Sequence, residues 1–249
     1  MILALDSSTS VLSLGLGRPE SGGVCWLATR ELPGGGQHGV LLPLELERLL
    51  LEARVSRAEL TGFVVGLGPG SFTGLRIGVA TLKGLAYGLR LPLAGASSLR
   101  AIASEAQRVD PVDALVVLLD ARQGEVYAAC FTGGRAEPTG VELSLPPAKL
   151  AEHLAGELGE SRARVRLVGE GAAVYREVLL RDFSASQLDL RWLAPKARFL
   201  GDLCWPLPAF SLPALCALEP HYVRPSEAEL KFPEGNFRAR PQETETKRD

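Results

Sequence analysis

The pattern of apolar and polar residues predicts an α/β protein whose first part, residues 1–108, forms one lobe with a mixed sheet. Strand-like and helical segments follow one another in the order strand, strand, strand, helix, strand, helix, strand, helix. The expected strands cover 2–5, 11–16, 24–28, 63–65 and 93–95, and the expected helices cover 38–53, 73–89 and 98–107. Helices that alternate with strands after an initial hairpin indicate a sheet with helices packed on it.

Residues 109–218 predict a second lobe. Strands are expected at 114–119, 125–131 and 166–169, and helices at 147–158, after Gly171, and at 195–203. From Pro206 the chain is rich in proline, and residues 231–249 are polar and charged. We therefore expect residues 219–249 to form a largely disordered C-terminal tail.

Both predicted lobes open in the same way, with an apolar strand, a terminal aspartate, a short polar turn and a returning strand. Asp6 and Asp120 hold equivalent places in this weak internal repeat. The duplication resembles the two-lobed actin-like ATPase (ASKHA) fold, in which the two hairpins face a cleft and hold nucleotide phosphates and a metal. The resemblance implies an α/β fold with duplicated mixed-sheet lobes.

The segment 66–84 combines a Gly-Pro-Gly turn with a helix that carries Gly74, Gly78, Gly84 and Gly88. Each glycine inside a helix costs about 1 kcal/mol relative to alanine, so something must pack very close to this helix. Its spacing fits neither the dinucleotide fingerprint, nor a Walker loop, nor a nucleophile elbow. Two interpretations remain open: a tight strand-to-helix turn with close packing, or a degenerate anion site at the helix start.

A degenerate nucleotide cleft is one hypothesis for the region between the lobes. Its candidate residues are Asp6, Ser8, Ser71, Arg76, Asp120 and Arg122. The two aspartates can bind water around Mg²⁺ or can simply cap turns. Arg76 and Arg122 can contact a phosphate or can form surface ion pairs. Ser8 stands where the actin-like fold usually has a glycine, and Arg122 is bulky where a phosphate would have to fit.

Composition narrows the class of protein. The chain has 249 residues, is 46% hydrophobic and carries a net charge of −2, which gives no general attraction to nucleic acid or membranes. No apolar run reaches the roughly 18 residues of a membrane span, and no signal peptide is recognisable, so we expect a cytoplasmic protein. The four cysteines are widely spaced and the three histidines are isolated in sequence, which argues against a metal site.

Four segments together closely resemble the TsaB (YeaZ) family of bacterial proteins. They are ILALDSST at 2–9, GPGSFTGLRIG at 68–78, GASSL at 95–99 and DARQGEVY at 120–127. The match is specific from residue 1 to about residue 131 and looser at 169–171 and 220–224. This chain departs from the family pattern in having Gly39 after His38 and in its longer C-terminal end.

The resemblance implies a partner protein with no catalysis and no cofactor of its own. Members of this family pair with TsaD, a metal-binding transferase that modifies the adenosine beside the tRNA anticodon with a threonylcarbamoyl group. A small ATPase, TsaE, joins the pair. ATP or ADP is then expected at the complex interface, the metal in TsaD, tRNA contact only within the complex, a homodimer when TsaD is absent, and no membrane. Residues 95–101, which match the histidine-rich metal segment of TsaD, contain no histidine or carboxylate.

The helices at 38–53 and 73–89 are the expected pairing surface. The first helix is apolar almost all the way round, and the glycines of the second permit close helix approach. The predicted interface residues are His38, Leu41, Leu42, Leu46, Leu49, Leu50, Gly74, Gly78 and Thr81, with Ala80, Gly84 and Gly88 as a second row. Arginine at Leu46 or Leu49 is expected to abolish pairing and leave a folded monomer. The alternative is a buried helix pair with no partner.

Two other classes of protein compete with the partner hypothesis. An actin-like small-molecule kinase predicts ATP turnover that depends on Asp6 and Asp120. A metallo-hydrolase predicts a bound metal, for which the sequence offers no ligand set.

Overall fold

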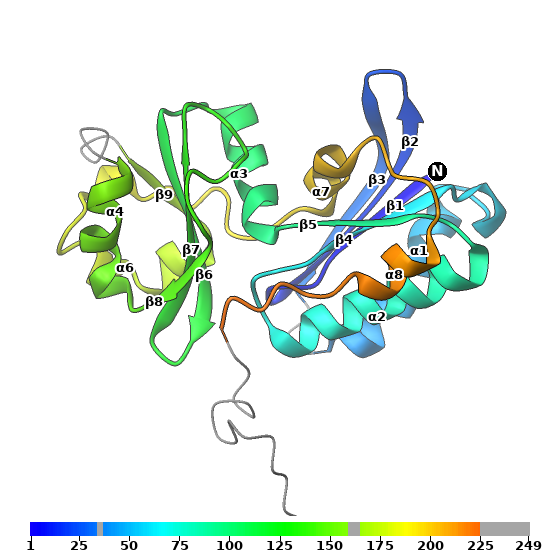
Figure 1. Cartoon of the computed structure of the whole chain (residues 1–249), viewed down its shortest axis with the longest axis horizontal. Helices are drawn as coiled ribbons and strands as arrows, with labels where there is room; N and C mark the ends of the chain where they lie inside the picture. Colours follow the sequence, from blue (N-terminus) through cyan, green and yellow to red (C-terminus); the bar gives the residue numbers. More distant parts are fainter. Residues whose placement is uncertain (34–36, 159–164, 225–249) are drawn as a thin grey trace, which may run out of the picture.

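The computed structural model describes residues 1–33, 37–158 and 165–224, and it has two lobes side by side (Figure 1). Each lobe is built on one mixed β-sheet with helices packed on it. The predicted α/β architecture is confirmed, and it is the two-lobed actin-like (ASKHA) fold.

The first sheet has the strand order β3-β2-β1-β4-β5. Its strands are β1 (Ile2–Asp6), β2 (Val11–Glu20), β3 (Gly23–Pro33), β4 (Gly62–Gly66) and β5 (Leu93–Ala96). β1 runs antiparallel to β2 and parallel to β4. Leu3 and Leu5 of β1 point to the face covered by α1 (His38–Glu52) and α2 (Phe72–Leu89), because side chains alternate along a strand.

The second sheet has the order β8-β7-β6-β9. Its strands are β6 (Ala114–Arg122), β7 (Glu125–Thr132), β8 (Leu143–Leu145) and β9 (Arg166–Val168), and α4 (Leu150–Leu158), α5 (Glu170–Val174) and α6 (Arg176–Leu179) lie in the same lobe. β6 runs antiparallel to β7 and parallel to β9, as β1 does to β2 and β4. Asp6 and Asp120 therefore occupy equivalent places, as the internal repeat predicts.

The two lobes exchange one helix each. α3 (Ser98–Val109) belongs to the first part of the chain, but its apolar face packs on β6 and β7 of the second sheet. α7 (Ala197–Cys204) belongs to the second part, but it packs on the first sheet against Ile2 and Ala4. The lobes in space therefore do not coincide with the predicted ranges 1–108 and 109–218, because α3 and α7 each pack on the other lobe's sheet. Periodicity indicates that a helix has an apolar face, but it does not say which sheet needs that face.

The C-terminal part of the described chain returns to the first lobe. A short helix, α8 (Leu212–Ala217), packs beside α2 and buries Leu215 in the core of the first lobe. Proline-rich composition conceals this helix from the sequence analysis. Residues 219–224 are described as well, and they lie against both lobes. The remainder of the predicted tail, 225–249, lies outside the described residues. No helix in the described part of the chain is long and apolar enough to cross a membrane.

The close packing that the glycines of α2 require comes from the chain itself. A Cβ atom at Gly74 would lie 2.1 Å from the carbonyl oxygen of Ser7, and one at Gly78 would lie 2.3 Å from the Ser7 hydroxyl. The Ser7 hydroxyl also donates a hydrogen bond of 2.9 Å to the carbonyl of Gly74. The β1–β2 turn therefore sits directly on the α2 backbone. Gly84 and Gly88, in contrast, have nothing within 4 Å of an added Cβ.

Two glycines of the same helix should consequently respond in opposite ways to alanine. Gly74→Ala should lower the free energy of unfolding by roughly 3 kcal/mol, because the new Cβ clashes with a backbone oxygen. Gly84→Ala should raise it by about 0.5–1 kcal/mol, because alanine has the higher helix propensity and nothing obstructs it. Urea unfolding followed by circular dichroism measures both values. Equal effects from the two variants would contradict this packing.

Candidate functional site

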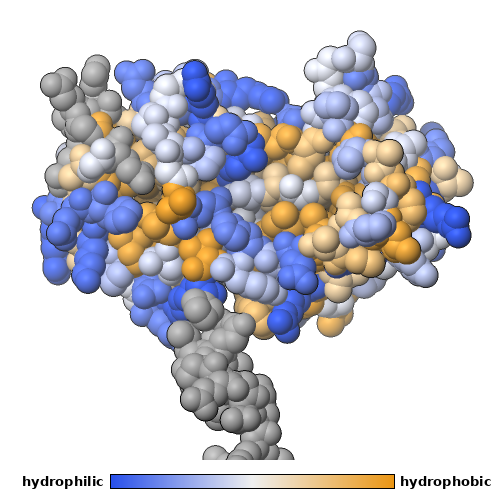
Figure 2. All heavy atoms as spheres, in the orientation of Figure 1, coloured by the Kyte–Doolittle hydropathy of each residue, from blue (hydrophilic) through white to orange (hydrophobic). Residues whose placement is uncertain are grey.

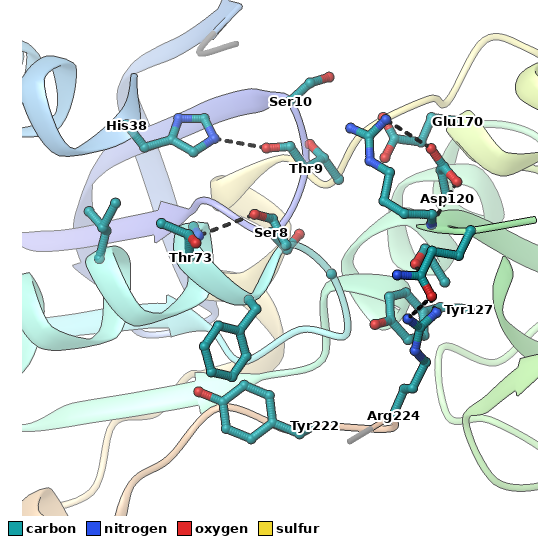
Figure 3. Close-up of a pocket in the computed structure, with 18 residues that line it drawn as sticks. Ser8, Thr9, Ser10, His38, Thr73, Asp120, Tyr127, Glu170, Tyr222 and Arg224 are labelled. Atoms are coloured by element: carbon teal, nitrogen blue, oxygen red, sulfur yellow. Dashed lines mark hydrogen bonds and ion pairs between the residues drawn. The ribbon is translucent and has the colours of Figure 1, made fainter. Parts of the chain in front are cut away.

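A cavity of about 500 Å³ lies between the two lobes and is the candidate site (Figure 3). On the first-lobe side it is lined by the β1–β2 turn, the start of α1 and the start of α2. On the second-lobe side it is lined by the tip of the β6–β7 hairpin and the start of α5. The residues on its wall are Ser8, Thr9, Ser10, His38, Gly70, Ser71, Phe72, Thr73, Gly74, Ile77, Asp120, Ala121, Arg122, Gln123, Tyr127, Glu170, Tyr222 and Arg224.

Asp6 does not reach this cavity. It is fully buried, and its two carboxylate oxygens accept hydrogen bonds from the Ser8 hydroxyl (2.6 Å), the Ser8 amide (2.8 Å) and the Ser98 hydroxyl (2.6 Å). Burial raises the pKa of Asp6, and the hydrogen bonds from Ser8 and Ser98 oppose that rise. Asp6 therefore holds the β1–β2 turn and the start of α3 together. The geometry corrects its predicted place in a nucleotide cleft.

The glycine loop before α2 packs tightly against the β1–β2 turn. The amide of Ser71 donates to the carbonyl of Ser8 at 2.6 Å, and the amide of Gly74 donates to the Ser71 hydroxyl at 3.2 Å. A Cβ at Gly70 would meet that same Ser8 carbonyl oxygen at 2.2 Å. Ser71 is thus the N-cap of α2, and a backbone oxygen fills the space beside the loop. The tight-turn interpretation is confirmed, and an anion site at the helix start stays a prediction.

Asp120 does line the cavity, and it is already engaged. Its carboxylate accepts hydrogen bonds from the Arg122 amide (2.9 Å) and the Tyr175 hydroxyl (3.0 Å), and it forms an ion pair of 3.2 Å with the Arg122 guanidinium. Of the two open interpretations of Arg122, the structure shows the ion pair. Glu170 lies on the same wall, where burial first and the charge of Asp120 second raise its pKa.

Tyr222 and Arg224 at the mouth of the cavity lie in the segment 220–224, which the family resemblance includes but to which the sequence assigned no role. Tyr222 packs on the ring of Phe72, with ring centroids 5.1 Å apart, and its hydroxyl accepts a hydrogen bond of 3.1 Å from Arg76. The Arg76 guanidinium lies 4.1 Å above the Phe72 ring. Arg224 closes the second-lobe side (Figure 3). No periodic signal marks Tyr222 and Arg224, because both follow the proline-rich stretch.

Most of the predicted pairing residues face the protein's own interior. Seven of the nine are buried: His38, Leu42, Leu46, Leu49, Leu50, Gly74 and Gly78. His38 Nε2–H donates a hydrogen bond of 2.8 Å to the carbonyl of Thr9, and its buried Nδ1 has no partner among the described residues. Leu41 and Thr81 are partly exposed. The predicted helices are present and most of the first row of predicted residues faces inward, whereas Ala80, Gly84 and Gly88 of the predicted second row face outward.

The outward side of the same two helices carries a different apolar surface. On α1, Val40, Leu44 and Leu51 are 77%, 45% and 75% exposed. They recur at spacings of four and seven residues and so share one face of the helix. On α2, Tyr87 is 64% exposed and follows the exposed Ala80 and Gly84. We call this surface the α1–α2 face.

Groups that could bind a metal do not gather in the described residues. Across 1–33, 37–158 and 165–224, no three His, Cys, Asp or Glu side chains come together in a way that could hold a metal ion. The four cysteines are all unpaired with one another.

Comparison with known protein families gives one extended match. The model of the TsaD family, described as tRNA N6-adenosine threonylcarbamoyltransferase, matches residues 34–231. Among curated proteins, TsaB of Escherichia coli is 35% identical over 128 residues, which is 51% of this chain and 53% of that protein. TsaB of Bacillus subtilis is 32% identical over 130 residues, which is 52% of this chain and 54% of that protein. The chain therefore spans about half the length of the curated relatives it matches.

Solved structures extend the similarity over most of the chain. YeaZ from Pseudomonas aeruginosa superposes with a TM-score of 0.64 at 30% identity, covering 82% of this chain and 91% of that one. A second crystal structure, of an uncharacterised protein with similarity to peptidase YeaZ from Pseudomonas aeruginosa, gives a TM-score of 0.70 at 29% identity. It covers 90% of this chain and 99% of that one.

The different surroundings of the two strand-end aspartates predict different losses of stability. Asp6→Ala should lower the free energy of unfolding by about 3 kcal/mol, because it leaves buried donors on Ser8 and Ser98 without an acceptor. Asp120→Ala should cost roughly 1 kcal/mol, because its partners border the cavity and can bind water. Chemical unfolding of both variants tests this. A larger loss for Asp120→Ala would overturn the assignment of Asp6 as the structural carboxylate.

The raised pKa of Asp6 also predicts the sign of a pH effect. The folded state holds the Asp6 proton more tightly than the unfolded state, whose carboxyl keeps its ordinary pKa of 3.8. The stabilising contribution is therefore fully present below that value and is lost as pH rises through the folded pKa. Asparagine does not titrate, so the stability advantage of the wild type over Asp6→Asn should shrink above pH 3.8. An advantage that grows with pH would contradict this.

Proposed function

The chain belongs to the TsaB (YeaZ) proteins within the family that the TsaD model describes, and we propose that it is a non-catalytic subunit in tRNA threonylcarbamoyladenosine synthesis. In this proposal it pairs with a TsaD-type transferase and activates it, and a TsaE-type ATPase joins them. The transferase supplies the metal, adenine nucleotide binds at the interface of the complex, and tRNA is contacted only by the assembled complex. Without its partner, the chain forms a homodimer through the same surface.

The α1–α2 face is the observation that carries this proposal. Large apolar side chains scattered singly on a surface are ordinary, but a row of them along one helix beside a second apolar helix marks a binding surface. Val40, Leu44 and Leu51 form such a row, and Tyr87 lies on the neighbouring helix. Figure 2 shows apolar residues over part of the near face of this lobe, on the right, while α1 lies behind α2 in this view.

The two glycines of α2 that face open space, Gly84 and Gly88, support the same surface. Gly74 and Gly78 are explained by the chain's own β1–β2 turn, whereas Gly84 and Gly88 face open space. An exposed helical glycine costs roughly 1 kcal/mol with no compensating contact inside the protein. A partner helix that approaches the α2 backbone closely would supply that compensation.

The engaged polar groups around the cleft support an auxiliary role over the two competing classes. A small-molecule kinase needs free hydrogen-bond donors that bind the phosphates and carboxylates that reach the substrate. In this chain the glycine loop contacts the Ser8 carbonyl, and Asp6 is buried beneath it. Asp120 is occupied by Arg122 and Tyr175. A metallo-hydrolase needs three or more converging ligands, which the described residues do not bring together.

The central experiment mixes this chain with the TsaD-type transferase of the same organism. Light scattering after gel filtration should give the mass of a heterodimer. With the TsaE-type ATPase and the threonylcarbamoyl donor present, tRNA should be modified only when both proteins are supplied. Absence of a complex would overturn the proposal, and so would tRNA modification by this chain alone.

Arginine at Leu44 should weaken pairing about 100-fold, which corresponds to roughly 2.7 kcal/mol, because the interface would have to bury an unpaired charge. The matched control is Val174→Arg, which alters an exposed apolar side chain (60%, against 45% for Leu44) on α5 of the other lobe. It should bind the partner as tightly as the wild type. Calorimetric titration of each folded variant gives the affinities. Equal affinities for the two variants would place the interface elsewhere.

The expected behaviour of Leu46→Arg and Leu49→Arg changes with the structure. Both leucines are buried in the first lobe, so these variants should fail to fold instead of remaining as monomers. Gly84→Ala separates stability from pairing, because it should stabilise the free chain and yet weaken the complex by adding a Cβ on the contact face. A variant with both higher stability and unchanged affinity would show that no partner backbone approaches Gly84.

A further inference from the structure

The segment 219–224, which we call the strap, lies across the mouth of the interlobe cavity after it leaves α8 (Figure 1). Its start is fixed to the first lobe. The Lys83 ammonium group on α2 donates to the carbonyls of Cys216 and Leu218, at 2.9 and 3.0 Å. The amide of His221 donates to the carbonyl of Leu67 at 2.7 Å. These bonds attach the strap to the first lobe before it crosses.

The middle of the strap packs on the first turn of α2. The Tyr222 ring lies against Phe72, and Arg76 both covers the other ring and donates to the Tyr222 hydroxyl. Aromatic pairs of this kind contribute beyond the area they bury. Tyr222 therefore seals the first-lobe edge of the cavity with contacts that depend on the strap staying in place.

The end of the strap is bound to the second lobe. The Arg224 guanidinium donates to the carbonyl of Ala121 (3.4 Å), to the carboxylate of Glu125 (3.2 Å) and to the side-chain oxygen of Gln123 (2.7 Å). Its side chain is only 16% exposed. Three residues before Arg224, His221 Nδ1 lies 2.9 Å from the carboxylate of Glu142, which also belongs to the second lobe. The six-residue strap thus contacts both lobes through His221, Tyr222 and Arg224.

Arg224 binds the tip of the β6–β7 hairpin, where the backbone is strained. At the tip of the β6–β7 hairpin, Arg122, Gln123 and Gly124 have φ angles of 63°, 53° and 79°. Left-handed backbone at two successive non-glycine residues is strained and persists only where surrounding contacts enforce it. Arg224 makes hydrogen bonds on either side of Arg122, and the Asp120 carboxylate accepts the Arg122 amide.

We propose that the strap is a built-in clasp that holds the two lobes closed over the cavity. It acts on the lobes as a ligand acts in two-lobed proteins that close around a bound molecule. A ligand favours a closed arrangement by contacting both sides at once. The strap makes the same two-sided contacts from within the chain, where its effective concentration is high. Its release opens the cavity and frees Phe72 and Arg76 at the start of α2. This holds whether or not the chain pairs with a transferase.

The test is hydrogen–deuterium exchange on the full chain without any partner. Arg224→Ala should speed exchange about tenfold at residues 121–125 and at 7–10, because a hydrogen bond to a charged group is typically strong enough to shift a local opening equilibrium by that factor. Neither segment contains the altered residue, and they lie on opposite walls of the cavity. Arg181→Ala, an exposed arginine of the second lobe away from the cavity, is the matched control and should change neither segment.

Two variants of Tyr222 separate the contribution of its ring packing on Phe72 from that of its hydroxyl bond to Arg76. The phenylalanine variant keeps the ring packing and should exchange nearly as slowly as the wild type, whereas the alanine variant should resemble Arg224→Ala. Small-angle X-ray scattering should show a larger radius of gyration for Arg224→Ala and Tyr222→Ala. Faster exchange confined to 219–224, with unchanged scattering, would overturn the clasp and leave a locally bound segment.

A variant that fails to fold would not hide the answer. Arg224→Lys keeps the charge but cannot reach all three acceptors, and it should give an intermediate rise in exchange at 121–125. If it leaves both cavity walls as protected as in the wild type, the three hydrogen bonds do not hold the lobes and the proposal fails. Because every measurement uses the free chain, this result is independent of the pairing experiment.

Discussion

The fold depends on the contact between the β1–β2 turn and the backbone of α2. Gly70, Gly74 and Gly78 leave room for Ser7 and Ser8 to lie directly on the helix, and the Ser71 amide and the Ser7 hydroxyl bind across that contact. Asp6 fixes the same turn from beneath through Ser8 and Ser98. One small region therefore sets the position of the first sheet relative to α2 and α3. An added Cβ would meet a backbone oxygen at Gly70 and Gly74 and the Ser7 hydroxyl at Gly78.

That contact also determines what the cleft can do. In the duplicated architecture, the turn after the first strand and the glycine loop are placed to receive a ligand between the lobes. Here the chain's own serine carbonyl oxygen lies beside the loop, and Arg122 bonds to Asp120 on the opposite wall. The cavity that remains is bordered by hydroxyl groups and by internal ion pairs, and residues 219–224 cross its mouth. Asp120, Arg122 and Tyr175 on this wall therefore bind to one another.

The outer face of the first lobe has the opposite character. α1 has apolar residues on two sides, since Leu42 and Leu49 fill the core while Val40 and Leu51 face outward. Arg30 on β3 binds Glu45 on the narrow polar side, so the rotation of the helix about its axis is fixed by an ion pair to the sheet as well as by packing. The helix therefore presents its second apolar side outward as a defined surface. A surface of that kind suits recognition of another helix better than it suits catalysis.

The sequence by itself determined the elements, the duplication and the helices of interest. Alternating strands and amphipathic helices are local patterns, so β1, α1, α2 and β6 begin and end within a few residues of the expected bounds. The glycines of α2 likewise predicted a close contact, because their cost in a helix can be read from the local sequence alone. Only the tertiary structure decided what makes that contact, which side of α1 stays outside, and where α3, α7 and residues 219–224 lie. Those outcomes depend on which apolar faces remain uncovered after the two sheets have formed, and periodicity within a single helix contains no information about its neighbours.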